Sequence, residues 1–555
     1  MGEAEVLTEL FSKEKLDLDT WWHDLIGQKP NFDNFDLQKA IDTIPRTEVK
    51  AAEAVHAKFK NILSYTESRN QWFLWDGIIH TPCDGDGIAM KVAKKFYFAM
   101  ADALDFIKAF IEKEALKIEA SGSATATADA KKCRDSYDKG EISKHKRFRD
   151  KMSTDAGLNA LVRTMKTECD VPGDYFDNDQ RWFVMRDYVL DLDELRKGNW
   201  VPAKHDPSRP VTKFFDAHYN AGTKNLGHWD SFLEKSIPSE AQREHLQIVT
   251  GAAFMGESKL RTILNLHGPP GSGKSVYVGT FFKLGKGGAG YSCMPDSKSV
   301  TKVSGQNFEQ DSYKGRRFIG ISEPPMGDPI DNEFLKKFTG DEWVETRTLN
   351  VKSSGWVPQG VVFVASNKAL KINSRDKAIV ERVQMIEFPI EFKPAGPGVL
   401  PEHTRVPDLE ELIMEDRERV LAWVIQGMLK FIKAGRQISP PEEVRKHQED
   451  LVVDASTALR WVKDWVKDGL LEETPQTDPD YYIPIKDAYQ RYQIWIAMTG
   501  EKRPLTLRFF VQDITSMYGD PVVSGGIERF KGLTVTPEYR RMYGQNGINA
   551  LAAGY

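Results

Sequence analysis

Apolar residues recur every three to four positions through much of the first 118 residues, the spacing that places them on one face of a helix. The clearest case is "KVAKKFYFAMADALDFIKAFIEKEAL" at 91–116, where aromatic and aliphatic residues are interleaved with charged ones. The pattern predicts a mostly helical N-terminal region over residues 1–118.

The apolar spacing weakens over 119–150. The stretch "ASGSATATADA" at 120–130 is small and polar, and the "KKCRDSYDKGEISKHKRFRDK" that follows is rich in basic residues. Such composition is typical of connecting segments, so we predict a linker and basic segment here. Short strand-like runs such as "RWFVMRDYVLDL" at 181–192 then predict a mixed α/β domain over 151–228.

Helical spacing returns at 229–257, and strands alternate with helices over 258–392. That alternation is typical of a mostly parallel sheet covered by helices. Helices resume over 393–450. Within 451–555, two helical patterns precede the strand and turn signature "GGIERFKGLTVTP", which suggests a winged helix. The chain is thus predicted to be a multidomain protein of the α/β and α classes.

Length and composition narrow the setting. A chain of 555 residues favours two or three domains, and no apolar stretch reaches the length of a membrane span. The first residues lack a signal-peptide pattern, and the four cysteines form no CxxC pair, which predicts a cytoplasmic protein without zinc. Because the net charge is −5, contacts with nucleic acid would have to be local.

The segment "GPPGSGKS" at 268–275 matches GxxxxGK[ST] and lies between a strand-like run, "TILNL", and a helical pattern. In such loops glycines let backbone N–H groups face phosphates, the lysine reaches the β and γ phosphates, and the serine hydroxyl binds Mg²⁺. We therefore predict that ATP and Mg²⁺ bind here, with Lys274 and Ser275 in those roles. The predicted binding residues are Gly268, Pro269, Pro270, Gly271, Ser272, Gly273, Lys274, Ser275 and Val276.

Two later apolar strands end in polar residues. "RRFIGISEPP" places Glu323 at the end of a strand, where it could act as a catalytic base and second Mg²⁺ ligand. "GVVFVASN" places Asn367 at the end of another, where it could contact the γ phosphate. Taken alone, each is an ordinary strand end, but their order after the phosphate loop favours the catalytic interpretation.

The order of these motifs resembles superfamily 3 helicases, in particular the phage, plasmid and large-DNA-virus group related to the poxvirus primase-helicase. The resemblance covers most of the chain. Beside the loop it is carried by "SEPPMGDPIDNEFLKKFTGDEWVETRTLN" and "VVFVASNKALKINSRDKAIVERVQMIEFPIEF", upstream by "WFLWDGIIHTPCDGDG" and "DYFDNDQRWFVMRDYVLDL", and downstream by "ERVLAWVIQGMLKFIKAG" and "IKDAYQRYQIWIAMTGEKRPLTLRFF". The chain departs from the family pattern at Ser322, where many such motors have Asp, at Thr339–Asp341, where one glycine is missing, and at Glu381, where an arginine is usual.

The resemblance implies an AAA+ type ATPase motor over 258–392 that forms a ring, usually a hexamer, with 229–257 as a helical oligomerisation collar. ATP would bind between subunits, and single-stranded DNA would pass through the channel, typically in the 3′ to 5′ direction. Arg382 is the first choice for the arginine that completes a neighbour's site, with Arg375 and Arg347 as substitutes. A surface salt bridge from Arg382 to Glu381 or Glu387 is the alternative.

About forty residues separate Glu323 from Asn367, and "WVETRTLNVKSSGWVPQGVVFV" reads as a hairpin. The resemblance implies that this hairpin lines the channel, with Lys352 on a phosphate and Trp356 stacked on a base; Trp356 could equally pack against its own hairpin. Lys336 and Lys337 could line the same channel or lie on a solvated helix face. Further basic residues are the run at 144–151 and, in the predicted winged helix, Arg503, Arg508, Arg529 and Lys531.

The leading hypothesis is a replicative, ATP-driven DNA helicase of a phage, plasmid or DNA virus, acting on forked DNA in the host cytoplasm beside a separate primase or polymerase. Two alternatives remain. One is a bifunctional primase-helicase with an N-terminal active site. The other is a ring that binds origin DNA and uses ATP as a switch rather than as fuel.

Overall fold

The computed structural model describes residues 18–220, 227–257, 260–285, 290–295, 313–322, 336, 338–340, 344–346, 354–367, 379, 381–474, 479–500, 504–537 and 539. These residues form two compact units, the first ending at Phe215 and the second containing nearly all described residues from Asp216 onwards. No helix among the described residues is long and apolar enough to cross a membrane.

The first unit combines helices with a small sheet. Strands β1 (Leu63–Thr66), β2 (Gln71–Trp75) and β3 (His80–Cys83) pair antiparallel in that order. The helices around them are α2 (Trp21–Leu25), α3 (Leu37–Thr43), α4 (Glu48–Lys58), α5 (Gly87–Ala120), α6 (Ala126–Lys139), α7 (Ile142–Met152) and α8 (Asp155–Glu168). The region predicted as mostly helical therefore also contains a sheet, whose Trp72 and Leu74 join the same buried core as α4 and α5.

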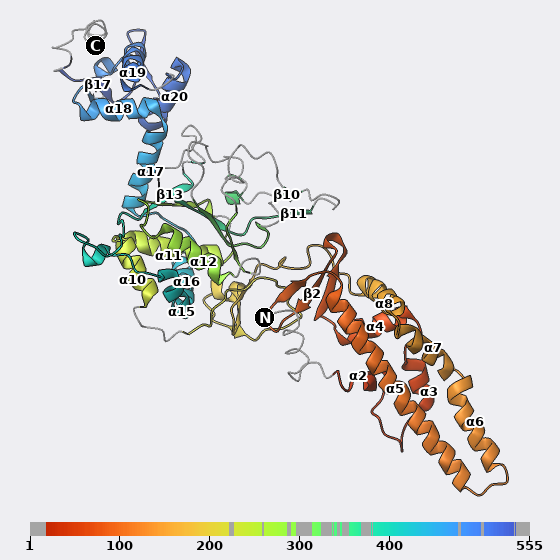
Figure 1. The fold of residues 1–555 in the computed structure, drawn as a ribbon. Coiled ribbons are helices and arrows are strands. Elements are labelled where there is room, and N and C mark those ends of the chain that lie inside the picture. Colours follow the sequence, from red (N-terminus) through yellow and green to blue (C-terminus); the bar gives the residue numbers. More distant parts are fainter. Residues whose placement is uncertain are drawn as a thin grey trace. The chain divides into compact units, whose positions relative to one another are not determined.

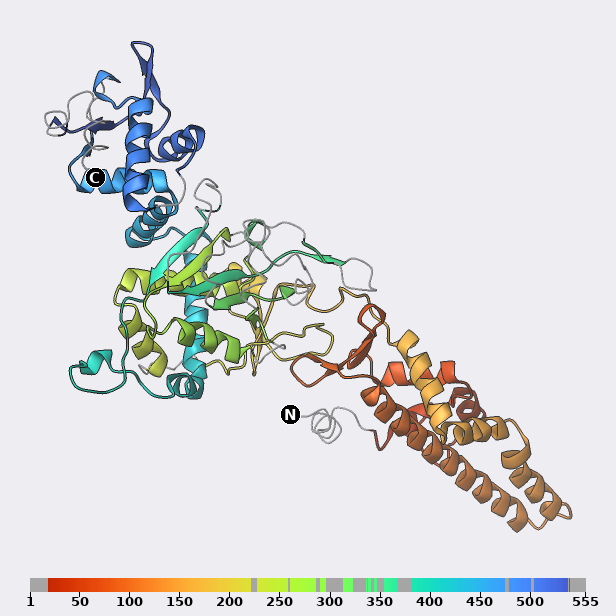
Figure 2. The ribbon, with the colours of Figure 1, turned by 45° about the horizontal axis from the view of Figure 1, so that its top comes forward.

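Residues 119–150 are not the linker that their composition suggested. They form α6 and α7, and α6 lies alongside the long helix α5 in both ribbon views (Figures 1 and 2). Ala126, Ala130 and Tyr137 are buried at helical spacing, and the Tyr137 hydroxyl donates to the Leu104 carbonyl of α5 at 3.3 Å. Small residues looked like linker composition, but alanine favours helix and allows close helix packing.

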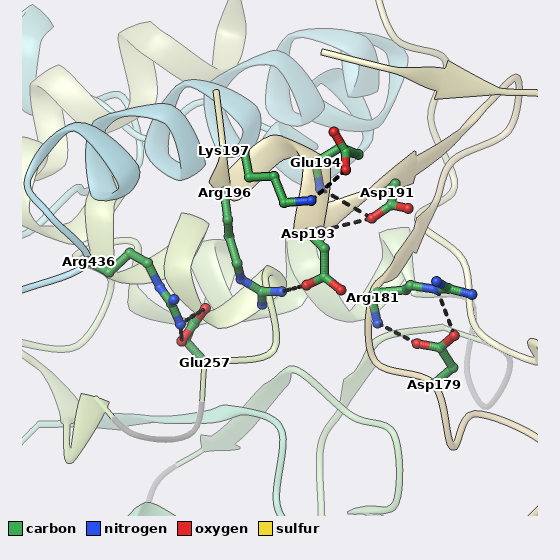
Figure 3. Close-up of polar contacts among 9 residues, drawn as sticks. All are labelled: Asp179, Arg181, Asp191, Asp193, Glu194, Arg196, Lys197, Glu257 and Arg436. Carbon is green, nitrogen blue, oxygen red and sulfur yellow. Dashed lines mark hydrogen bonds and ion pairs between the residues drawn. The ribbon is translucent and has the colours of Figure 1, made fainter. Parts of the chain in front are cut away.

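A second small sheet follows in the first unit. It consists of β4 (Trp182–Val184), β5 (Val189–Asp191) and β6 (Pro202–Ala203), with the short helix α9 (Leu192–Arg196) after β5. Figure 3 shows why α9 begins where it does: the Asp191 carboxylate accepts from the backbone N–H groups of Asp193 and Glu194. This N-cap satisfies donors that the first turn leaves without a helical partner.

The second unit is built on the mostly parallel sheet that the sequence predicted. Five parallel strands lie in the order β13-β7-β12-β9-β8, with β7 at Ile263–His267, β8 at Ser292–Cys293, β9 at Phe318–Ser322, β12 at Val361–Ser366 and β13 at Val383–Glu387. Their nearly unbroken apolar sequences suit strands that are buried on both faces. A separate two-stranded sheet of β10 (Val344–Thr346) and β11 (Ser354–Trp356) lies where the hairpin was predicted.

Helices α11 (Glu240–Phe254) and α12 (Lys274–Leu284) pack against this sheet. Outside them, α10 (His228–Ser236) and α16 (Arg417–Lys433) pack against α11, and α15 (Leu409–Glu415) packs against α12. Helices α11 and α16 cross at two glycines: a Cβ at Gly251 would lie 2.3 Å from the Gly427 carbonyl carbon. Figure 3 also shows Arg436, just after α16, bonded to both carboxylate oxygens of Glu257, just after α11. The segment 229–257, which was predicted as an oligomerisation collar, contains α10 and α11 of the second unit, and its role in oligomerisation stays a prediction.

The C-terminal part has the predicted order of helices and hairpin. After α17 (Glu442–Ala455) come α18 (Thr457–Lys467), β14 (Leu471–Glu473), α19 (Ile485–Thr499), α20 (Leu507–Tyr518), β15 (Val522–Ser524), β16 (Ile527–Arg529) and β17 (Leu533–Val535). β15 and β16 form a hairpin, and β17 pairs with β14. Trp461, Tyr492 and Phe510 lie at the centre of its core.

Candidate nucleotide site

The glycine-rich loop leaves the end of β7 and enters α12, which begins at Lys274. Gly271 and Gly273 have φ values of 75° and 99°, in the left-handed region that side chains rarely adopt. A Cβ at Gly273 would also lie 2.7 Å from Phe232 Cε2 and 2.9 Å from Ser236 Oγ. Both backbone conformation and crowding therefore require glycine at this position.

The start of α12 gives the loop its capacity to bind an anion. The first N–H groups of a helix have no partner within it, and the helix dipole adds positive charge at the same end. Pro270, Gly271 and Ser275 are exposed, whereas Ser272 is buried and Val276 is half-buried. The backbone N–H groups at residues 273–276 lie at this helix start, and helix starts of this kind bind phosphate and other anions in many proteins.

Lys274 is folded into the loop. The residue is 4% exposed, and its ammonium donates to the Gly268 and Pro269 carbonyls at 2.8 Å and to Ser272 Oγ at 3.0 Å. Three neutral oxygens compensate part of the cost of burying this charge. Bringing the ammonium onto a phosphate requires exchanging these bonds for stronger, charge-assisted ones.

The ends of three strands meet at this edge of the sheet. β12 lies between β7 and β9, and its register pairs Ser366 with His267 and Ala365 with Ser322. Because the strands are parallel, the residues that follow them leave at the same edge. Asn367, half-buried, follows β12 directly. Glu323 follows β9 but lies outside the described residues, so its predicted role as base and Mg²⁺ ligand stays a prediction.

One polar pair near this edge was not predicted. Ser366 Oγ donates to Asn265 Oδ1 of β7 at 2.8 Å, and both side chains are buried. Asn265 Nδ2 is buried without a hydrogen-bond partner among the described residues. The bond connects Ser366, the last residue of β12, to β7, the strand that precedes the loop, and so it also holds the backbone that leads into Asn367. In the sequence, the only sign of this pair was an asparagine within the mostly apolar strand β7.

Residues at the end of the stretch 361–392 also contact the loop, although no role was predicted for them. The Phe388 N–H donates to the His267 carbonyl at 2.7 Å, and the Phe392 N–H donates to the Gly271 carbonyl at 3.2 Å. A Cβ at Gly268 would lie 2.1 Å from the Phe388 carbonyl oxygen. The chain that leaves β13 therefore runs directly against the loop, a contact that no local pattern indicates.

The predicted arginine has a partner within its own chain. Arg382 precedes β13, is half-buried, and donates from Nη1 to Thr339 Oγ1 at 3.0 Å. Its expected alternative partner Glu387 instead pairs with His447 Nε2 at 3.3 Å. The substitutes Arg347 and Arg375 lie outside the described residues.

The predicted DNA contacts fall mostly outside the described part of the chain. Lys337 and Lys352 are not described, Trp356 is described only as part of β11, and Lys336 is half-buried. Among the described residues, no three His, Cys, Asp or Glu side chains gather as a metal site would require. The structure thus brings together the loop and the strand ends but leaves the channel prediction open.

The basic run at 144–151 is largely neutralised. It forms most of α7, with Phe148 buried, and Lys144, Lys146 and Lys151 are paired with Glu141, Asp138 and Glu48. Its cations therefore belong mainly to ion pairs on the helix surface.

Comparison with known proteins gives three findings. Residues 52–238 match the family described as "D5 N terminal like". A putative helicase from Acanthamoeba polyphaga mimivirus is 25% identical over 164 residues, which are 29% of this chain and 17% of that protein. The aligned part thus spans less than a fifth of the relative's length.

Solved structures of the NrS-1 C-terminal region are among those that resemble this chain. Two apo structures have TM-scores of 0.35 and 0.34 with 14% and 12% sequence identity. Each match covers 59% of this chain, and 84% or 83% of the other. Likenesses this low support no conclusion about site or activity.

Proposed function

We propose that this chain is an ATP-driven DNA helicase of superfamily 3 type, acting as a ring, with a hexamer expected, that moves 3′ to 5′ along single-stranded DNA. The observation that carries the proposal is the meeting of the loop after β7 with the ends of β9 and β12 at one edge of a parallel sheet. The match to the D5 N-terminal-like family and the similarity to a viral protein named a putative helicase favour a helicase over other nucleotide-binding proteins.

The proposed mechanism assigns a role to each strand end. The backbone N–H groups of 273–276 and the Lys274 ammonium hold the phosphates of ATP, and Ser275 and Glu323 hold Mg²⁺, which would neutralise charge on the phosphates. Glu323 accepts a proton from the attacking water, and Asn367 orients the γ phosphate. Arg382 of a neighbouring subunit completes the site by stabilising charge in the transition state.

Lys274 would change partners when ATP binds. In the present structure its ammonium is held by Gly268, Pro269 and Ser272. A phosphate offers a charged acceptor in their place, and charge-assisted hydrogen bonds are about twice as strong as neutral ones. The ammonium would then leave the loop carbonyls for the β and γ phosphates.

A helicase must hydrolyse ATP to separate strands, whereas a ring that uses ATP as a switch need only bind it. We expect Glu323→Gln to retain ATP binding and ring assembly while losing hydrolysis and unwinding. Size exclusion with light scattering and a phosphate-release assay measure these separately. Unwinding by the Glu323→Gln protein at the native rate would exclude Glu323 as the base.

A bifunctional primase-helicase is the alternative within enzymes, and the D5 N-terminal-like match leaves it open. Template-dependent primer synthesis from ribonucleotides by the purified chain alone would favour it. A ring that binds DNA and assembles with ATP, but never separates strands, would favour the switch.

A further inference from the structure

One face of α5 in the first unit carries an exposed basic and aromatic stripe. Lys91, Lys94, Lys95 and Phe98 are all exposed, at spacings of three, four and seven residues that place them on one side of the helix. Residues on the opposite side, including Val92, Phe96 and Met100, are buried in the core of the unit. We call these four exposed residues the α5 stripe.

Phe98 is unusual for a surface residue. It is 60% exposed, and its ring meets the ring of Tyr97 edge to face at 5.3 Å between centroids. A single exposed apolar residue needs no explanation by itself. An exposed ring that follows two exposed lysines, Lys94 and Lys95, by one helical turn does, however, combine the stacking face and the positive charge that proteins use to bind single strands.

Lys91 and Lys94 differ from two lysines further along the same helix. In the described part of the chain, neither Lys91 nor Lys94 forms an ion pair. Further along α5, Lys113 pairs with Asp33 at 3.1 Å and Lys117 pairs with Glu114 at 2.6 Å. Four of the α7 cations, Lys144, Lys146, Arg149 and Lys151, are paired as well. The positive charge of these residues is therefore locally cancelled, whereas that of Lys91 and Lys94 is not.

We propose that the α5 stripe binds single-stranded DNA outside the motor, with Lys91 and Lys94 on phosphates and Phe98 stacked on a base. Charge complementarity selects the occupant, since a polyanion matches Lys91 and Lys94, which have no carboxylate partner in the described part of the chain, and a base offers a flat face to an exposed ring. The inference rests on the proposed action on single-stranded DNA but not on ATP hydrolysis.

The same helix provides a matched control position. Leu116 lies eighteen residues after Phe98, about five helical turns, and so faces the same side. It is 53% exposed, but its surroundings are acidic and paired: Arg134 binds both Glu112 and Glu119. If exposure of an apolar side chain were enough to bind DNA, both Phe98 and Leu116 would contact it. If the α5 stripe binds DNA, only Phe98 will contact it.

The first test places a photo-crosslinking amino acid at position 98 or at position 116 of the full chain. Each protein is irradiated with a labelled thirty-nucleotide oligo-dT without nucleotide. We expect crosslinking at position 98 to exceed that at position 116 at least fivefold. Equal yields at the two positions, or a crosslink from position 98 to protein and not to DNA, would overturn the proposal.

The second test uses the salt dependence of binding. Each phosphate contact on a single strand contributes about 0.7 to the slope of log K against log salt, so Lys91→Gln with Lys94→Gln should reduce the slope by about 1.4. Lys113→Gln with Lys117→Gln removes the same charge from the same helix but should leave the slope unchanged. An equal change of slope for the two double variants would show that only net charge matters, and it would contradict binding at the α5 stripe.

These tests separate this inference from the proposed function. One result is that the chain binds oligo-dT with equal crosslinking at positions 98 and 116 and with equal salt slopes for the two lysine pairs. That result would refute only the proposal that the α5 stripe binds DNA. A native chain that binds no single-stranded DNA at all would refute the stripe together with the helicase proposal. The four side chains are exposed, so circular dichroism should confirm an unchanged fold in every variant.

Discussion

At the scale of single residues, the substitution Gly273→Ala tests whether the backbone of the loop binds phosphate. Gly273→Ala must adopt a φ of 99° and place a methyl group 2.7 Å from Phe232. Left-handed backbone costs a non-glycine residue about 1–2 kcal/mol, and the contact adds to it. We expect ATP affinity to fall at least tenfold while the rest of the unit stays folded. Titration with a fluorescent ATP analogue measures the affinity, and Gly87→Ala, at a position with open space, is the control. Unchanged affinity would mean that the loop does not bind phosphate in this conformation.

Asp177 gives a second prediction at the residue scale. Its carboxylate accepts from the Thr212 N–H at 2.7 Å and from the Thr212 hydroxyl, and Lys213 Nζ lies 3.4 Å away. Burial alone would raise the pKa of Asp177, but Lys213 and Thr212 outweigh it and hold that pKa below its ordinary value. The contribution to stability is therefore complete above the unfolded pKa of about 3.9 and is lost as pH falls through the folded pKa.

Asp177→Asn should remove this acid sensitivity. Asn tolerates the left-handed φ of 58° at this position, so the backbone need not change. We expect the variant to be less stable at neutral pH, yet to lose less further stability between pH 5 and pH 3. Urea unfolding at each pH, followed by pulse-labelled hydrogen exchange of peptides from 174–215, provides the measurement. Parallel curves for the two proteins would contradict the assigned cause.

At the scale of elements, the crossing of α11 and α16 depends on two glycines. A Cβ at Gly427 would lie 2.2 Å from the Gln247 carbonyl oxygen, so Gly427→Ala must push the helices apart. Overpacking of this kind costs about 1–3 kcal/mol. We expect a lower midpoint of thermal unfolding for the second unit and an unchanged first unit. A native midpoint would show that the helices separate without cost.

The elements also show how far sequence reasoning reaches. The parallel sheet, the loop between β7 and α12 and the C-terminal hairpin were predictable because each has a local pattern of apolar spacing or glycine placement. α6 was missed because its alanines and threonines resemble a linker until α5 is available to pack against. The Ser366–Asn265 bond and the Phe392 contact with the loop join residues far apart in sequence, so only the register of the folded sheet reveals them.

At the scale of the whole molecule, the ring proposal makes Arg382 act on a neighbouring subunit. Arg382→Ala should bind ATP normally but hydrolyse it about 10³ to 10⁵ times more slowly. Mixed with Lys274→Ala protein, which is expected to be inactive by itself, it should regain hydrolysis, because Arg382 of a Lys274→Ala subunit can complete the site of a neighbouring Arg382→Ala subunit. No regain of hydrolysis in mixed rings would instead restrict Arg382 to its bond with Thr339 within one chain.

The central claim is that the loop's phosphate is the fuel for strand separation. The most direct measurement is unwinding of forked duplexes that carry only a 3′ or only a 5′ single-stranded tail, with ATP and Mg²⁺, by the native chain and by Lys274→Ala. The account predicts separation from the 3′ tail alone and none by the variant. Separation by Lys274→Ala at the native rate, or no separation by a native ring that hydrolyses ATP when DNA is added, would contradict it.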